Sequence, residues 1–270
     1  MRPPVALTIA GTDSGGGAGV AADLKTFAAH GVWGTCAVTA VTAQNTALVG
    51  HIQRLPPSVV TAQIGAVVTD MAVAAAKTGM LGDSRVVGAV VAAVEEWGLL
   101  PLVVDPVATS TSGSKLATPG GLAAIRTRLL PMADLVTPNL GEATALAEWP
   151  DPPGDRARME RLAFAVLDLG PAAVLVTGGH LPGPEAADVL VTRTGGSEAH
   201  WLTTPRVDTS NTHGTGCVLS AAITARLARR EPLVQAVEGA KRFVTAAIAA
   251  GVDLGRGPGP VNPSSGSSPP

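Results

Sequence analysis

Residues 5–24 read VALTIAGTDSGGGAGVAADL, and the order of elements in this stretch decides the fold. Residues 5–10 form a short apolar run that predicts a buried strand. Residues 11–19 are rich in glycine, and apolar residues recur at helical spacing from Val20 onward. A strand, a glycine-rich turn and a helix start make a place where backbone N–H groups can approach a ligand closely. The glycine spacing does not match the P-loop motif, and the dinucleotide-binding fingerprint fails at Val20. The alternative to a ligand-binding loop is an ordinary flexible turn.

The same alternation continues along the chain. We expect further strands over residues 36–42, 73–78, 102–107, 135–137, 173–177, 189–194 and 199–202. We expect further helices over residues 59–68, 84–97, 122–130, 140–147, 156–169, 217–229 and 234–250. Gly195 and Gly196 separate the last two strands and indicate a hairpin. The alternation predicts an α/β fold with a mostly parallel central sheet and helices on both faces. We expect a single domain over residues 1–254 and a loose Gly/Pro/Ser-rich tail over 255–270.

Composition excludes several classes of protein. The chain has 270 residues, of which 46% are apolar, so it can bury a sizeable core. Nineteen basic and 21 acidic residues give a net charge of −2, and aromatic residues make up only 3%. This balance disfavours a nucleic-acid partner. No apolar run is long enough to cross a membrane, and two cysteines form no disulfide framework. We therefore expect a cytoplasmic protein that binds neither nucleic acid nor membrane.

A second glycine-rich turn, residues 211–217 (NTHGTGC), precedes an apolar helix. Its glycines let backbone amides converge, and the helix start adds partial positive charge, which together favour a transferring phosphoryl group. Cys217 lies where the pKa of a thiol is usually lowered, so it is a candidate base or nucleophile. The alternative is that Cys217 is only a small residue in a helix cap.

Four charged or polar positions are further candidates. Lys241 lies on an apolar helical stripe, where it either meets an anionic partner or extends to the surface. Asn139 and Glu142 have the spacing of a helix-capping pair, which by itself explains them. Asp105 ends a predicted parallel strand, at the edge where metal and phosphate sites collect.

The ordered set of short motifs resembles one family. The segments are ALTIAGTD (6–13), the loop 15–20, ADLKTF (22–27), VTAQNT (41–46), KTGML (77–81), DPV (105–107), TPN (137–139), GGH (178–180), the turn 211–217 and GPVN (259–262). Together they resemble hydroxymethylpyrimidine/phosphomethylpyrimidine kinases, the thiamine-pathway branch of the ribokinase-like superfamily. The resemblance implies a ribokinase-like fold and phosphorylation by ATP of 4-amino-5-hydroxymethyl-2-methylpyrimidine, then of its monophosphate. It also implies Mg²⁺, a small-molecule pyrimidine substrate and a homodimer.

The resemblance also implies roles for individual residues. By position, the residues of the pyrimidine pocket are Gly11, Ala18, Asp23, Gln44, Met80 and Val107. The anion hole is formed by Gly214, Thr215, Gly216 and Cys217, and Lys241 faces the phosphates. Cys217 stands at the position where most of the superfamily has an Asp base. The residues near ATP are Asn139, Thr177 and Gly179, and those helping to place Mg²⁺ are Asp105 and Glu142. From the residues alone, Asp23 is better interpreted as a carboxylate that complements the helix dipole.

The chain departs from the family pattern where cations are usual. Thr177 stands where Lys is frequent before the GGH segment, Thr111 lies where Lys often precedes Ser-Gly, and Pro258 replaces a His. These departures remove one or two cationic phosphate contacts. They keep open the alternative of a non-catalytic pyrimidine-binding protein. A second alternative is a pyridoxal or pyridoxine kinase of the same fold, against which the Gln44 segment and Cys217 favour the thiamine precursor.

Overall fold

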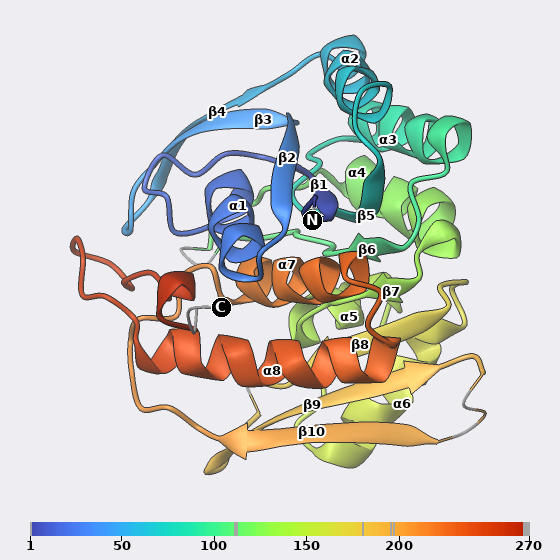
Figure 1. The fold of residues 1–270 in the computed structure, drawn as a ribbon. Coiled ribbons are helices and arrows are strands. Elements are labelled where there is room, and N and C mark those ends of the chain that lie inside the picture. The colour runs from blue at the N-terminus through green and yellow to red at the C-terminus, as the bar shows by residue number, and fades with distance from the viewer. Residues whose placement is uncertain (1, 111–112, 180, 195, 197, 267–270) are drawn as a thin grey trace.

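A computed structural model describes residues 2–110, 113–179, 181–194, 196 and 198–266, and its centre is an eight-stranded sheet (Figure 1). The strands of this sheet, in chain order, are β1 Val5–Ala10, β2 Trp33–Val38, β5 Val73–Thr78, β6 Leu102–Val104, β7 Leu135–Val136, β8 Ala173–Thr177, β9 Glu185–Thr192 and β10 Ala199–Pro205. Their spatial order is β10-β9-β8-β7-β6-β5-β1-β2. All neighbours from β8 to β2 are parallel, and β9 and β10 add an antiparallel hairpin at one edge. The predicted, mostly parallel sheet is confirmed.

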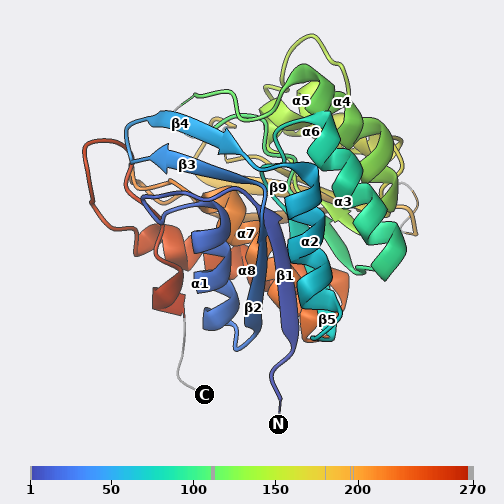
Figure 2. The same cartoon turned by 90° about the horizontal axis from the view of Figure 1, so that it is seen from above.

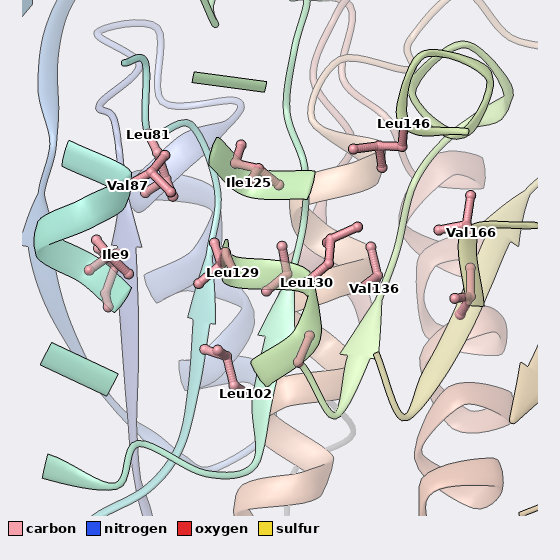
Figure 3. Packing of buried hydrophobic residues seen from close by; sticks show 14 of the residues in the cluster. Ile9, Leu81, Val87, Leu102, Ile125, Leu129, Leu130, Val136, Leu146 and Val166 are labelled. Carbon is pink, nitrogen blue, oxygen red and sulfur yellow. The ribbon is translucent and has the colours of Figure 1, made fainter. Parts of the chain in front are cut away.

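Helices cover both faces of the sheet, as expected (Figures 1 and 2). The helices are α1 Gly19–Ala29, α2 Pro57–Val68, α3 Ser84–Trp97, α4 Pro119–Ala124, α5 Leu140–Leu146, α6 Arg156–Leu167, α7 Thr215–Ala228 and α8 Leu233–Ala249. Alternate residues of one strand belong to different layers, because side chains alternate across a sheet. Leu102 and Val104 pack with α2–α6, whereas Val103 packs with α7 and α8. Figure 3 shows part of the first layer.

The expected strand over residues 36–42 is wrong, because the chain leaves the sheet in its middle. β2 ends at Val38, and β3 (Ala40–Gln44) instead pairs with β4 (Val49–Arg54) in a separate antiparallel ribbon. Thr39 makes the break: its N–H donates to the Ala10 carbonyl, 3.0 Å away, and its hydroxyl to the Met80 carbonyl. Figure 2 shows the β3–β4 ribbon beyond the ends of β1 and β2.

Other element boundaries differ for local reasons. β6 ends at Val104, short of the expected residue 107, because Pro106 lacks the N–H that a central strand needs. The helix expected over residues 122–130 begins earlier, since the Thr118 hydroxyl accepts the Gly121 N–H. It ends as a π-helical turn over Ile125–Leu129 and a 3-10 turn over Leu130–Met132.

Residues 256–261 of the expected loose tail pack against the fold, and the last four residues of that tail, 267–270, lie outside the described part of the chain. The N–H groups of Arg256 and Gly257 both donate to the Thr46 hydroxyl, at 3.2 and 3.1 Å. Val261 is buried, and its N–H donates to the carbonyl of His213. Local composition misses this because the partners lie far away in sequence.

Among the described residues, no helix is both long and apolar enough to cross a membrane. Four residues used in the sequence interpretation lie outside the described part of the chain: Thr111, Ser112, His180 and Gly195.

Candidate active site

The parallel strands end at one edge of the sheet, and several of the sequence-predicted site residues follow those ends. Gly11 follows β1, Met80 follows β5, Asp105 follows β6 and Asn139 follows β7. Asn139 also forms an isolated parallel bridge with Thr177 at the end of β8. The structure therefore brings residues from distant parts of the chain to the edge where ligands of α/β sheets bind.

The glycine-rich loop after β1 is held by the carboxylate of Asp13. Its Oδ1 accepts the N–H of Gly15 at 2.8 Å, and its Oδ2 accepts those of Gly17 and Ala18 at 3.1 and 2.9 Å. Burial would raise the pKa of Asp13, but hydrogen bonds from His213 and these N–H groups hold it below its usual value. Gly19 ends the loop with φ of 56°, and a Cβ added to this residue would lie 2.3 Å from the carbonyl oxygen of Gly11. The loop is thus ordered by its own side chain and by close backbone packing.

The second glycine-rich turn supplies the N-terminus of α7. Gly214 is the N-cap residue and has φ of 84°, and α7 begins at Thr215. The first N–H groups of a helix have no partner within it, so those of Gly216 and Cys217 are available to an anion. A Cβ on Gly214 would lie only 1.8 Å from the carbonyl oxygen of Gly17. The two glycine-rich segments therefore meet at van der Waals contact.

A buried ion pair lies beneath this contact. Lys77 Nζ is 2.9 Å from Asp23 Oδ1, the Thr8 hydroxyl donates to Asp23 Oδ2 at 2.6 Å, and both charged side chains are fully buried. Burial raises the pKa of Asp23 despite the charge of Lys77. Burial alone would lower the pKa of Lys77, but negative groups, Asp23 first among them, keep it above its usual value. The expected contact between Asp23 and the pyrimidine stays a prediction; in this structure the two carboxylate oxygens bind Lys77 and Thr8.

Sequence reasoning gave Lys77 no role, although one signal was present. A lysine stands inside the otherwise uncharged strand β5, where an ammonium needs an anionic partner. That the partner is Asp23, 54 positions earlier, is visible only in the fold.

The expected lowering of the Cys217 pKa is wrong. The side chain is partly accessible, yet burial raises the pKa of the thiol to about 12, and the charge of Lys77 does not compensate. The carboxylates of Asp23 and Asp105 raise it further, against a hydrogen bond from the Gly19 N–H. At neutral pH this group is a thiol and not a thiolate.

Asp105 and Glu142 form a pair of buried carboxyl groups. The predicted capping box is present: Asn139 Oδ1 accepts the Glu142 N–H at 2.9 Å, and Glu142 Oε2 accepts the Asn139 N–H at 3.0 Å. The Ser220 hydroxyl donates to Asp105 at 3.1 Å. Burial raises the pKa of Asp105 to about 6, and burial together with the charge of Asp105 raises that of Glu142 to about 8.

This pair leads to a prediction for stability. A carboxyl group whose pKa is raised on folding stabilises the folded state at low pH and loses that contribution as pH rises through the folded pKa. The stability of the metal-free protein should therefore fall between pH 4.5 and 8 through Glu142. Glu142→Gln keeps a capping side chain but cannot ionise. In urea unfolding, the variant should gain stability relative to the parent as pH rises across this range. A difference independent of pH would contradict the assignment.

Lys241 points inward, but its partner is a protein carboxylate. Lys241 Nζ lies 2.7 Å from Asp188 Oδ2, and Asp188 Oδ1 accepts the N–H of Gly178 at 3.0 Å. That Lys241 also faces the phosphates stays a prediction. Through Asp188 it holds the backbone where β8 meets the loop containing Gly179.

The same loop is held by an arginine that the sequence did not single out. Arg206 donates to the carbonyl oxygens of Gly179, Leu181 and Gly183, at 2.6, 2.5 and 2.9 Å. Arg206 directly follows β10, so the edge hairpin positions the loop. Its local sequence carries no signal for this function.

Of the remaining pyrimidine-pocket candidates, Met80 and Val107 follow the ends of β5 and β6, and Gln44 belongs to the β3–β4 ribbon. Met80 is buried with Ala40 and Leu116, and Val107 packs against this cluster. Gln44 ends β3, and its N–H donates to the Ser14 hydroxyl at 3.1 Å. The structure thus places Gln44 beside the first glycine-rich loop.

The chain is similar to known proteins over nearly its whole length. The family model described as phosphomethylpyrimidine kinase matches residues 13–262. A hydroxymethylpyrimidine/phosphomethylpyrimidine kinase of Streptomyces coelicolor is 47% identical over 262 residues, covering 97% of this chain and 95% of that protein. The protein of the same name from Escherichia coli is 41% identical and covers 97% and 98%.

Solved structures are similar over almost the whole chain. An ADP complex of Bacillus subtilis pyridoxal kinase aligns with a TM-score of 0.89 at 35% identity and covers 98% of both chains. A phosphomethylpyrimidine kinase from Clostridium difficile aligns with a TM-score of 0.78 at 37% identity, covering 90% of this chain and 99% of that one.

Proposed function

The chain belongs to the phosphomethylpyrimidine kinase family, and on this premise we propose that it transfers the γ-phosphoryl group of ATP to a hydroxymethylpyrimidine. The substrates are 4-amino-5-hydroxymethyl-2-methylpyrimidine and then its monophosphate, and the product is the pyrophosphate used in thiamine biosynthesis. One observation carries the proposal. The loop assigned to the pyrimidine and the helix start assigned to the phosphoryl group meet where Gly17 packs on Gly214.

The second turn supports the transfer by electrostatics and position. Phosphoryl transfer requires mainly alignment and neutralisation of charge on the transferred group. The N–H groups at the start of α7 and its dipole provide fixed positive charge there. Because the thiol of Cys217 is protonated at neutral pH, we assign the contribution of this residue to its backbone N–H rather than to proton abstraction. Gly214, Thr215 and Gly216 complete the turn.

Asp105 and Glu142 are proposed to hold Mg²⁺. The donors fit a hard cation, because carboxylate oxygens are its preferred protein ligands. The buried hydroxyls of Thr78 and Thr137, at the ends of the two strands that flank β6, have no hydrogen-bond partner among the described residues. Bound Mg²⁺ would neutralise phosphate charge. Asn139, Thr177 and Gly179 lie at the ends of β7 and β8, where we place ATP.

Gln44 is proposed to recognise the edge of the pyrimidine, because its amide offers both a donor and an acceptor. Gln44→Leu should weaken the specificity for the pyrimidine, measured as kcat/KM, by about 1–3 kcal/mol, the cost of an unpaired buried polar group. The KM for ATP should change little. Gln53→Leu, on the exposed strand β4, serves as a matched control. Equal kinetics of Gln44→Leu and the parent would remove this residue from the site.

The activity is tested by coupled ADP release with three substrates side by side: the hydroxymethylpyrimidine, its monophosphate and pyridoxal. We expect kcat/KM to be highest for the two pyrimidines. Preference for pyridoxal would instead favour the pyridoxal kinase alternative, which the similarity to the Bacillus subtilis structure supports. Tight pyrimidine binding without ADP release would identify a non-catalytic binding protein.

We also propose a cytoplasmic homodimer. The support is family membership, together with Trp33, which is 59% exposed on the edge strand β2. Sedimentation equilibrium measures the subunit number directly.

A further inference from the structure

A histidine and an aspartate join the two glycine-rich segments through a contact that the chemistry above does not use. His213 Nε2 lies 2.8 Å from Asp13 Oδ2, although the two residues are 200 positions apart. The side chains are only 10% and 2% exposed. Breaking this hydrogen bond would leave two buried polar groups unpaired, which costs free energy. The pair therefore constrains the two backbone segments that carry it.

On the side of the first loop, Asp13 has both oxygens engaged. Its carboxylate already accepts the N–H groups of Gly15, Gly17 and Ala18. The contact with His213 is thus made by the same group that orders the whole loop. A shift of the imidazole would be transmitted directly to the backbone beside Ala18, which we assign to the pyrimidine.

On the side of the second turn, the backbone of His213 is fixed on both sides. Its N–H donates to the Gly259 carbonyl and its carbonyl accepts the Val261 N–H, each at 3.1 Å. The ring lies against the first loop so closely that a Cβ on Gly17 would be 2.5 Å from His213 Cδ2. The next residue, Gly214, is the N-cap of α7. The position of the ring therefore sets where the N–H groups of that helix point.

We propose that Asp13 and His213 are positioning residues that fix the pyrimidine loop relative to the phosphoryl-binding turn. Neither side chain is assigned a contact with substrate. The inference deepens the proposed function and rests on it. Its physical basis is that in-line transfer needs reacting atoms about 3–3.5 Å apart, and a misplacement of about 1 Å can cost roughly 10²-fold in rate.

The kinetic test compares His213→Asn, Asp13→Asn and the double variant. Asn at position 213 keeps a polar side chain but is too short to span the contact. We expect kcat of His213→Asn to fall by roughly 10²-fold, while KM for ATP and for the pyrimidine changes little. The double variant should be no slower than the slower single variant, because the two residues act through one contact.

His30→Asn is the matched control. His30 is also a buried histidine, with Nδ1 2.9 Å from the Thr26 oxygen and its ring 4.4 Å from that of Phe243, but it lies outside the site. Its substitution should reduce thermal stability and leave kcat unchanged. If kcat of both histidine variants falls together with their stability, His213 is merely structural and the inference is wrong.

A second measurement reports how exposed the turn 211–217 is, and it needs no substrate. In a Cys36→Ser background, alkylation of Cys217 follows the exposure of the start of α7. Release of the turn should make alkylation of His213→Asn severalfold faster than that of the parent, and His30→Asn should match the parent. Unchanged alkylation overturns the inference whatever the kinetics show. If instead the parent does not turn over the pyrimidines, the proposed function fails, and the alkylation rates still decide whether this pair positions the turn.

Discussion

Replacing Lys77 with Met is expected to lower the free energy of unfolding by about 3–5 kcal/mol, the usual cost of removing one partner of a buried ion pair. The ammonium is fully buried and lies 2.9 Å from Asp23. Without it, Asp23 is a carboxylate in the interior, and among the described residues the Thr8 hydroxyl is the hydrogen-bond donor that remains. Asp105, which also interacts with the charge of Lys77, would lose the same compensation.

The measurement is urea unfolding followed by circular dichroism, with Lys115→Met as the control at an exposed lysine. The double variant Lys77→Met/Asp23→Asn should recover part of the loss, because it removes the uncompensated charge. The deficit should also depend on pH. Without Lys77 the folded pKa of Asp23 rises further, so the folded state binds a proton that the unfolded state releases, and the variant loses stability as pH rises. A deficit equal to that of Lys115→Met would show that the pair contributes nothing.

The sequence predicts local features of this site well. The capping box of Asn139 and Glu142 depends on residues three positions apart, so their spacing alone indicates it. The glycine-rich stretches 11–19 and 211–217 likewise indicate places where the backbone can approach another group closely. What spacing does not show is that these stretches pack on each other, with Gly17 against Gly214.

The errors arise where tertiary structure outweighs a local rule. A cysteine at a helix start usually has a lowered pKa. The pKa of Cys217 is instead raised by burial and by the charges of Asp23 and Asp105, which come from other elements. Helical spacing indicates that Lys241 lies on an inward stripe, but it does not show that the partner is Asp188, which comes from β9. The break at Thr39 depends on carbonyl groups of Ala10 and Met80, which no property of residues 36–42 reveals.

The two stretches meet at Gly214, and Gly214→Ala should therefore abolish most of the activity, lowering kcat by about 10³-fold, the upper range for loss of a group that stabilises the transition state. Two independent costs act on this residue. Its φ of 84° is unfavourable for any residue with a side chain. The new Cβ would also lie 1.8 Å from the Gly17 oxygen, so the turn and the loop must separate.

Gly31→Ala distinguishes these two costs. Gly31 also has a positive φ, 68°, but a Cβ there meets nothing within 4 Å. This control should lose stability from backbone strain alone and keep its kcat. Gly214→Ala carries the same strain and in addition displaces the N–H groups at the start of α7 from the transferring phosphoryl group. Its loss of kcat should therefore exceed anything that its melting temperature explains. If Gly214→Ala keeps the kcat of the parent, the close contact between the start of α7 and Gly17 is not needed for phosphoryl transfer.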